Sequence, residues 1–220
     1  MSEKESFKGI TIVTCAVMRR ELQKLQDEGF LDADGILFTT AGNHEKPWDM
    51  ERELPEKLKE AAEKSGLVIV ALGKKCYFNT NTPEKTIDDL IAETGVNAVR
   101  VNAEDCIDML SDKQMRKKVE ETRTVYWITP GWLMEKDNIF GDWDQGKANE
   151  TFPRHDAALM LDVIGFFNEI SMTDPEALLG FADWMQIPIE PVEVGMDRLK
   201  KLLLSSLELV KTGQSSFEGR

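Results

Sequence analysis

Runs rich in β-branched residues alternate with helical stretches along the chain as far as Pro130. The run 67–72, LVIVAL, lies between two glycines and has no polar face, which is typical of a strand in the middle of a parallel sheet. Alternating strands and helices favour parallel strands joined by right-handed crossovers. We therefore predict an α/β fold with a doubly wound, Rossmann-like, mostly parallel sheet and helices on both faces. The expected strands are 10–14, 36–40, 67–72, 98–101 and 125–128, and the expected helices are 17–27, 49–64 and one capped by Thr82 before Pro83.

The pattern changes after Pro130. We expect 142–154 to be a loop, 157–170 a strongly apolar helix, and the chain from Asp174, as a cap, to about residue 185 a further helix. The segment 187–194 holds two prolines and is expected as an edge strand, followed by a last helix over 196–210. Because no repeat or long linker interrupts the chain, residues 1–210 are predicted to form a single domain. Residues 211–220 are expected to be a disordered tail.

The chain carries 40 Asp and Glu against 27 Lys and Arg, a formal net charge of −13. An excess of this size repels phosphate, so binding to nucleic acid or to an anionic membrane surface is not expected. No apolar run approaches the roughly 20 residues that span a bilayer, and the N-terminal segment lacks the apolar stretch of a signal peptide. A cytoplasmic location is therefore expected.

Three cysteines, Cys15, Cys76 and Cys106, are the main candidates for chemistry. Structural disulfides are not expected in a reducing compartment, so these are free thiols or ligands. Each follows a predicted strand within a few residues, at the edge where open α/β sheets bind ligands. Three convergent thiolates could hold zinc with a fourth ligand or an iron–sulfur cluster with one open corner, whereas the cobalt of a corrinoid would use one ligand, with the others nearby. The alternative is three separate core thiols, because free cysteine is often buried and the chain has no CxxC pair.

His44 and Trp132 are further candidates at the same edge. His44 follows the second predicted strand and could serve as a fourth ligand or general base, or could simply lie in an exposed loop. Trp132 ends the turn 129–132, TPGW, and could form the wall of a pocket for a planar ligand or fill the core. Both residues are therefore predicted to contact a cofactor if the cysteines bind one.

Familiar catalytic and nucleotide-binding motifs are absent from the sequence. The chain has neither a GxGxxG nor a GxxxxGK[ST] loop, so NAD, FAD and ATP are not expected as cofactors. A Cys–His nucleophile pair that includes Cys15 or Cys106 is an alternative, although no oxyanion signature accompanies it. His155 begins a predicted helix and is more simply explained as a structural residue. No catalytic residue is therefore assigned.

Five segments look familiar together: 12–15 (IVTC) with 20–22 (REL), 55–58 (PEKL), 104–107 (EDCI) and 126–132 (YWITPGW). They resemble the uncharacterised family called domain of unknown function 1638, and the similarity extends over roughly residues 9–207. The resemblance implies that cysteines matching the three found here are family features. It also implies a link to one-carbon metabolism, because members occur in anaerobes and methylotrophic archaea, often encoded near corrinoid-dependent methyltransferases.

The leading hypothesis is a cytoplasmic protein that binds a metal or metallocofactor through the three cysteines, with Trp132 and His44 shaping the pocket. The cofactor would be zinc, an iron–sulfur cluster or a corrinoid, and it would serve methyl-group metabolism. One alternative is an accessory protein without chemistry of its own, which binds a corrinoid protein or methyltransferase through its acidic face and segment 132–143. Another is a cysteine-dependent enzyme acting on a small molecule. The fourth ligand, the substrate and the oligomeric state are left open.

Overall fold

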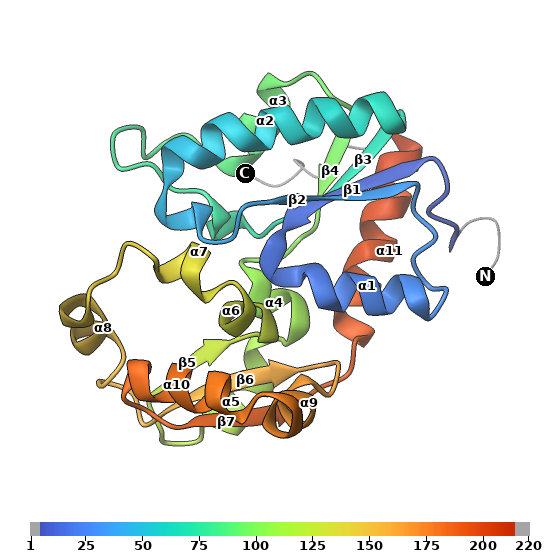
Figure 1. The fold of residues 1–220 in the computed structure, drawn as a ribbon. Coiled ribbons are helices and arrows are strands. Elements are labelled where there is room, and N and C mark those ends of the chain that lie inside the picture. The colour runs from blue at the N-terminus through green and yellow to red at the C-terminus, as the bar shows by residue number, and fades with distance from the viewer. Residues whose placement is uncertain (1–4, 214–220) are drawn as a thin grey trace.

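The strands form two separate sheets, both entirely parallel, in the computed structural model, which describes residues 5–213 (Figure 1). The first sheet has four strands in the order β2-β1-β3-β4, and the second has three in the order β5-β6-β7. The predicted α/β fold with parallel strands is confirmed, but the strands are divided between two sheets instead of forming one. The strands are β1 (Ile10–Cys15), β2 (Gly35–Thr39), β3 (Leu67–Ala71), β4 (Ala98–Arg100), β5 (Val125–Ile128), β6 (Ala157–Asp162) and β7 (Ile189–Glu193).

Helices cover and separate the two sheets (Figure 1). The α-helices are α1 (Arg19–Asp27), α2 (Pro47–Lys64), α3 (Ile87–Glu93), α4 (Cys106–Leu110), α5 (Lys113–Glu120), α6 (Pro130–Met134), α7 (Lys136–Phe140), α8 (Gln145–Thr151), α9 (Phe166–Thr173), α10 (Pro175–Met185) and α11 (Asp197–Thr212). Three short 3-10 helices are η2 (Ala16–Met18), η3 (Asn43–Glu45) and η4 (Lys74–Cys76). The helices that matter most for the site are α1, α4 and α6, which lie between the two sheets.

The first sheet has helices on both faces. Successive side chains of a strand point to opposite sides, so Ile12 of β1 joins an apolar cluster with α1 and α11, whereas Val13 joins one with α2 and α3. Helix α2 contacts β1, β2 and β3, and α11 contacts β3 and β4. This is the doubly wound arrangement that the alternation of strands and helices predicts.

The two sheets are joined through a shared core. We define the first lobe as the first sheet with α2, α3 and α11, and the second lobe as the second sheet with α8, α9 and α10. A single apolar cluster includes Ile12 of β1, Leu199 of α11 and Ala158 of β6, so it extends through both lobes. Arg20 of α1 also donates hydrogen bonds to both carboxylate oxygens of Glu169 in α9, at 3.1 and 3.0 Å. Helix α1 therefore packs against both lobes.

The prediction of a helix over 157–170 is wrong. Ala157–Asp162 is β6, the middle strand of the second sheet, and α9 begins only at Phe166. Every residue of β6 is buried, because strands cover both of its edges and helices pack on its faces. A strand that is apolar on both faces has the composition of a buried helix, and hydrophobic periodicity cannot separate the two.

Asp144 and Asp174 each begin a helix by the same contact. The Asp144 side chain accepts the N–H of Lys147 at 2.8 Å, and α8 follows inside the segment 142–154 that was expected to be a loop. The Asp174 side chain accepts the N–H of Ala177 at 3.1 Å and begins α10, as predicted. Helix α8 has no apolar period in its sequence, so only its cap could have indicated it.

Thr86, and not Thr82, caps the third predicted helix. The Thr86 hydroxyl accepts the N–H of Asp89 at 3.2 Å, and the Asp89 carboxylate accepts the N–H of Thr86 at 2.8 Å. This reciprocal capping box satisfies two amide groups at once, so the helix begins at Ile87.

The C-terminal elements largely follow expectation. β7 is an edge strand, as its prolines predict. Helix α11 continues to Thr212, so the first two residues of the expected tail are helical, and 214–220 lie outside the described residues. Within residues 5–213, no helix combines the length and the apolar character needed to cross a membrane.

Candidate functional site

The carboxyl edge of the first sheet brings the three cysteines into one region. The chain passes from β1 to β2 on one side and from β3 to β4 on the other, so the strand order reverses between β1 and β3. Such a switch point is the usual ligand-binding position of an open parallel sheet. Cys15 ends β1, Cys76 ends η4 after β3, and Cys106 begins α4 after β4. Their sulfur atoms are close enough to interact electrostatically with one another.

Cys15 is surrounded by backbone groups from two loops. The N–H groups of Val17 and Gly42 face its sulfur, and its thiol donates a long 4.0 Å contact to the carbonyl oxygen of Thr40. Gly42 has a φ of +86° and lies against the backbone of Ile139 in α7. Because a side chain at that position would be strained and would also overlap α7, glycine is required there.

Cys76 is held by a loop that is tied to the loop of Cys106. The amide N–H of Gly73 donates a 3.2 Å hydrogen bond to the Cys76 sulfur. The amide of Lys74 donates a 2.9 Å hydrogen bond to the carbonyl oxygen of Ala103, and the amide of Lys75 donates a 2.8 Å hydrogen bond to that of Glu104. These backbone bonds fix the two cysteine-bearing loops side by side.

Trp132 of α6 reaches Cys106 from the direction of the second sheet. Its indole Nε1 is buried and has no standard hydrogen-bond partner among the residues that the structure describes. The indole N–H faces the Cys106 sulfur at a looser geometry and lowers the pKa of that thiol against the larger effects that raise it. Gly131 places the tryptophan, since a Cβ at Gly131 would overlap the backbone of Val17.

All three thiols hold their protons more tightly than an ordinary cysteine. Burial raises the pKa of Cys15 to about 11, and burial together with the neighbouring Cys15 raises the pKa of Cys76 to about 12. Burial raises the pKa of Cys106 well above its usual value, and the neighbouring Cys76 and Cys15 add smaller effects in the same direction. Three thiolates can therefore coexist here only if a positive charge replaces their protons.

Two polar aromatic side chains flank Trp132, at ring-centroid distances of 6.3 Å for His44 and 5.8 Å for Tyr126. His44 is exposed, yet desolvation by the protein around it lowers the pKa of its imidazole against the opposing effect of Glu45, so the ring is neutral at pH 7. Burial, with smaller effects of Glu45 and Cys106, raises the pKa of Tyr126 to about 12. Tyr126 was not predicted as a site residue, because only tertiary packing brings β5 near Cys106.

The cysteines do not form a ready-made site for a single ion. In the described chain, no three His, Cys, Asp or Glu side chains are arranged to hold one metal ion. His155 lies on the other side of Tyr126, with ring centroids 5.2 Å apart, and its Nδ1 is 3.0 Å from the Phe152 carbonyl oxygen. His155 lies between α8 and β6 and does not begin a helix, because the predicted helix 157–170 is a strand followed by α9.

Other features of the molecule lie away from the cysteines. A shallow surface hollow in the second lobe is lined by residues of α10 and the segment after it, with Gln145, and contains no cysteine. The Trp143 indole N–H donates a 3.0 Å hydrogen bond to Glu45, and its ring stacks on Phe152. Neither feature contributes a group to the thiol region.

The family match includes three of the five segments noted in the sequence, 55–58, 104–107 and 126–132. A model of the family described as Protein of unknown function (DUF1638) matches residues 38–203. The match includes Cys76, Cys106, His44 and Trp132, whereas Cys15 precedes it. Searches of the curated proteins and of the solved structures found no match. Because the family model covers well over half of the 220 residues, the chain belongs to the DUF1638 family of proteins of unknown function.

Proposed function

We propose that the protein binds an iron–sulfur cluster through the thiolates of Cys15, Cys76 and Cys106 and leaves one iron open to an exchangeable ligand. The observation that carries the proposal is the convergence of three thiols at the switch point of the first sheet, each with an N–H group directed at its sulfur. Cysteine thiolates are the usual ligands of such clusters.

The N–H groups favour thiolate ligands over inert thiols. A neutral thiol is a weak acceptor, whereas an ionised acceptor forms hydrogen bonds about twice as strong. Hydrogen bonds to the ligating sulfurs are also a means by which proteins adjust the properties of a cluster. The donors are the amides of Val17 and Gly42 toward Cys15, the amide of Gly73 toward Cys76, and the indole of Trp132 toward Cys106.

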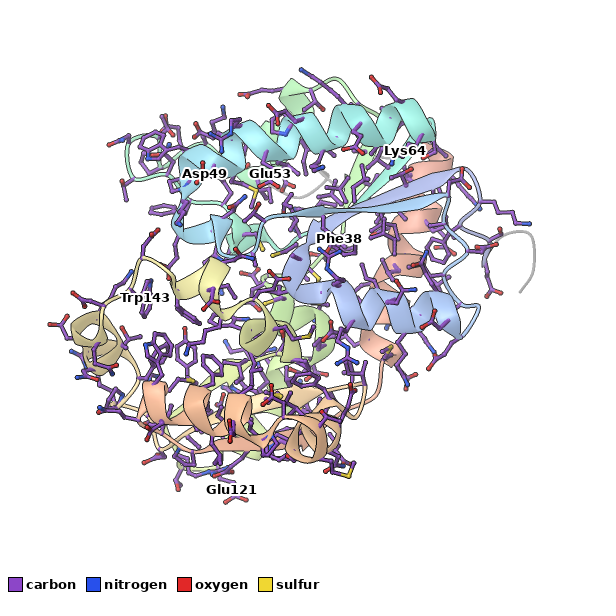
Figure 2. All side chains as sticks on the ribbon, viewed as in Figure 1. Phe38, Asp49, Glu53, Lys64, Glu121 and Trp143 are labelled. Carbon is purple, nitrogen blue, oxygen red and sulfur yellow. The ribbon has the colours of Figure 1, made fainter. Side chains whose placement is uncertain are left out.

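The local charge supports a bound cation. Glu135 and Glu53 both act on Cys15 in the direction that disfavours a thiolate, and Glu53 lies on α2 (Figure 2). Asp105 acts in the same direction on Cys76 and Cys106. Arg100 acts on Cys76 in the opposite direction, but its effect is the smallest of those on that thiol. A metal centre would supply further positive charge, and binding would release the thiol protons.

The lack of a single-ion group among the described residues favours a cluster over one zinc ion. Sulfurs that bind one tetrahedral zinc lie close together, whereas sulfurs that bind different irons of a cluster lie farther apart. The three thiols interact electrostatically, yet the part of the chain that the structure describes has no single-ion group. Zinc is therefore an alternative outcome of the test below.

Three thiolates leave a fourth position for His44 or for a small molecule. Tyr126 keeps its hydroxyl proton at neutral pH because its pKa is raised to about 12, so it can donate a hydrogen bond to a bound ligand. The proposed link to methyl-group metabolism, with a corrinoid protein or methyltransferase as partner, rests on the family resemblance. A small molecule of that metabolism is the proposed occupant of the fourth position.

The alternative functions have less support. A cysteine nucleophile needs a thiolate near neutral pH, which the raised pKa values of Cys15 and Cys76 oppose. A partner surface in segment 132–143 would need its tryptophans available, but the Trp143 ring stacks on Phe152 at 5.7 Å. Neither alternative uses the N–H groups directed at the sulfurs.

Anaerobic purification and reconstitution with iron and sulfide test the proposal. We expect a brown protein with about four irons and four sulfides per chain and visible absorption that Cys76→Ser removes. Ser206→Ala, which truncates a buried polar side chain in α11, is the control and should keep the colour. His44→Ala should alter the spectrum if His44 is the fourth ligand, with His155→Ala as its matched control.

Two results would overturn the cluster. A colourless chain that takes up one zinc per chain, lost in the same cysteine variant, would identify a single-ion site instead. A chain that takes up neither iron nor zinc, with cysteine variants that fold and behave like the wild type, would identify the cysteines as core residues.

A further inference from the structure

Glu21 of α1 is a carboxyl group buried without a partner. Its exposed fraction is 0%, and neither carboxylate oxygen has a hydrogen-bond partner within residues 5–213. An ionised carboxylate is costly in such a position, because neither water nor a protein donor replaces the hydration that it loses.

The charged groups near Glu21 do not neutralise it. Arg20 precedes it, but the Arg20 guanidinium donates to both oxygens of Glu169 and is partly exposed. Asp162, at the end of β6, accepts three backbone N–H groups around the start of α9. Helix α6 and η2, which also pack near α1, have no charged residue. Arg20 and Asp162 act on Glu21 in opposite directions, and neither forms a hydrogen bond with its carboxyl group.

Protonation of Glu21 removes the buried charge that has no partner. Burial is the main cause that raises the pKa of Glu21 to about 7, and Asp162 raises it further, while the Glu21 backbone N–H and Arg20 lower it. The carboxyl is thus neutral in the folded protein under mildly acidic conditions. Above neutral pH, folding must accommodate an uncompensated buried charge.

The position of Glu21 gives this proton a structural consequence. Helix α1 follows Cys15 through η2, and the backbone of Val17 in η2 lies directly against Gly131, next to Trp132. Figure 1 shows α1 between the first sheet and the second lobe. A change in how α1 packs would therefore move η2 and alter its contact with Gly131, and so the positions of Cys15 and Trp132.

We propose that Glu21 is a proton-binding group that holds α1 against the second lobe when protonated and loosens this packing when it ionises. The inference does not depend on the proposed cluster, since it concerns the chain without any cofactor. In this proposal, a buried side chain away from the cysteines makes the packing of α1 between the two lobes depend on pH.

Urea unfolding of the full chain between pH 5 and 8.5 tests the inference. In the wild type, the equilibrium constant for folding should fall by up to about tenfold per pH unit as the pH rises toward 7, because the folded state binds one more proton than the unfolded state. Glu21→Gln keeps the shape and removes the titration, so it should lack this component and be the more stable protein at pH 8. Glu169→Gln, which removes an exposed contact of the same helix, is the matched control and should keep the wild-type slope.

Hydrogen exchange of the α1 amides is a second measurement. After correction for intrinsic rates, the amides of α1 should become less protected above pH 7 in the wild type and remain protected in Glu21→Gln. Identical pH profiles for the two proteins would overturn the inference. Stability that depends on added sodium or calcium, and not on acid, would also overturn it and identify a buried cation site instead. If Glu21→Gln fails to fold, an NMR titration of the wild-type Glu21 carboxyl decides, and a midpoint near 4.5 rejects the inference.

Discussion

The amide N–H of Gly73 donates a 3.2 Å hydrogen bond to the sulfur of Cys76. The same glycine lies against the backbone of Asp105, the residue before Cys106, so closely that a Cβ would overlap it. A single residue without a side chain therefore directs a donor at one cysteine and sets the distance to the loop of another.

Gly73→Ala should separate these two loops. Because the added methyl group meets backbone atoms of Asp105, we expect the free energy of unfolding to fall by about 1–3 kcal/mol and cofactor uptake to be lost. Urea unfolding and iron analysis after reconstitution measure the two effects. Gly180→Ala, in α10 with no atom near its Cβ position, is the control and should be neutral or stabilising. Equal behaviour of the two variants would show that the loops adjust freely.

If the chain binds the proposed cluster, Trp132→Phe should change its reduction potential without preventing binding. The variant keeps an aromatic ring but loses the N–H that faces Cys106. A donor at a ligating sulfur stabilises the reduced state, because that state carries more negative charge. A net loss of about 1 kcal/mol corresponds to a reduction potential lower by about 40 mV, measurable by redox titration. Trp127→Phe is the matched control, because the Trp127 N–H donates a 2.7 Å hydrogen bond to Glu120 away from the cysteines. A potential that shifts equally in both variants would contradict the assigned contact.

Thiol alkylation in the chain without cofactor should be slow at neutral pH. The pKa of Cys15 rises from 9.0 to about 11, so its thiolate fraction at pH 7 falls about 100-fold, and the rate should increase with pH until about pH 11. Mass spectrometry of iodoacetamide adducts measures each cysteine separately. The same chain unfolded in urea is the control and should react at the ordinary rate. Rapid modification of one thiol at pH 7 in the folded chain would favour the cysteine-dependent enzyme.

Arg100→Met should destabilise the loop that leads to Cys106. Arg100 is 9% exposed and donates to both oxygens of Asp88, at 2.6 and 3.2 Å, and to the carbonyl oxygens of Val101 and Ala103. Removing it leaves a partly buried carboxylate and two carbonyls without their donor, so we expect a loss of about 3 kcal/mol in urea unfolding.

Two comparison variants isolate the cause of that loss. Adding Asp88→Asn to Arg100→Met should recover part of the stability, because the uncompensated charge is removed. Arg123→Met breaks an exposed pair in which one guanidinium nitrogen contacts both oxygens of Glu190, and it should cost less than about 1 kcal/mol. A similar cost for Arg100 and Arg123 would mean that burial of the Arg100 pair has no energetic effect.

The sequence predicted most of the first lobe because its signals are local. The apolar run at β3 and the amphipathic pattern of α2 each lie within one short segment, and strand ends place Cys15, Cys76 and Cys106 without knowledge of any distant contact. The prediction was wrong at β6, where a central strand buried on both faces has no period of two and looks like a buried helix.

The sequence by itself therefore determined the fold class, the parallel direction of the strands and the edge on which the cysteines lie. Only the tertiary structure decided that the strands form two sheets, that Trp132 faces Cys106, that Tyr126 approaches the same thiol and that Glu21 is buried without a partner. The physical reason is that strand pairing and burial depend on contacts between residues far apart in the chain. A local pattern of apolar and polar residues can specify a helix or a strand, but it does not specify which distant surface covers it.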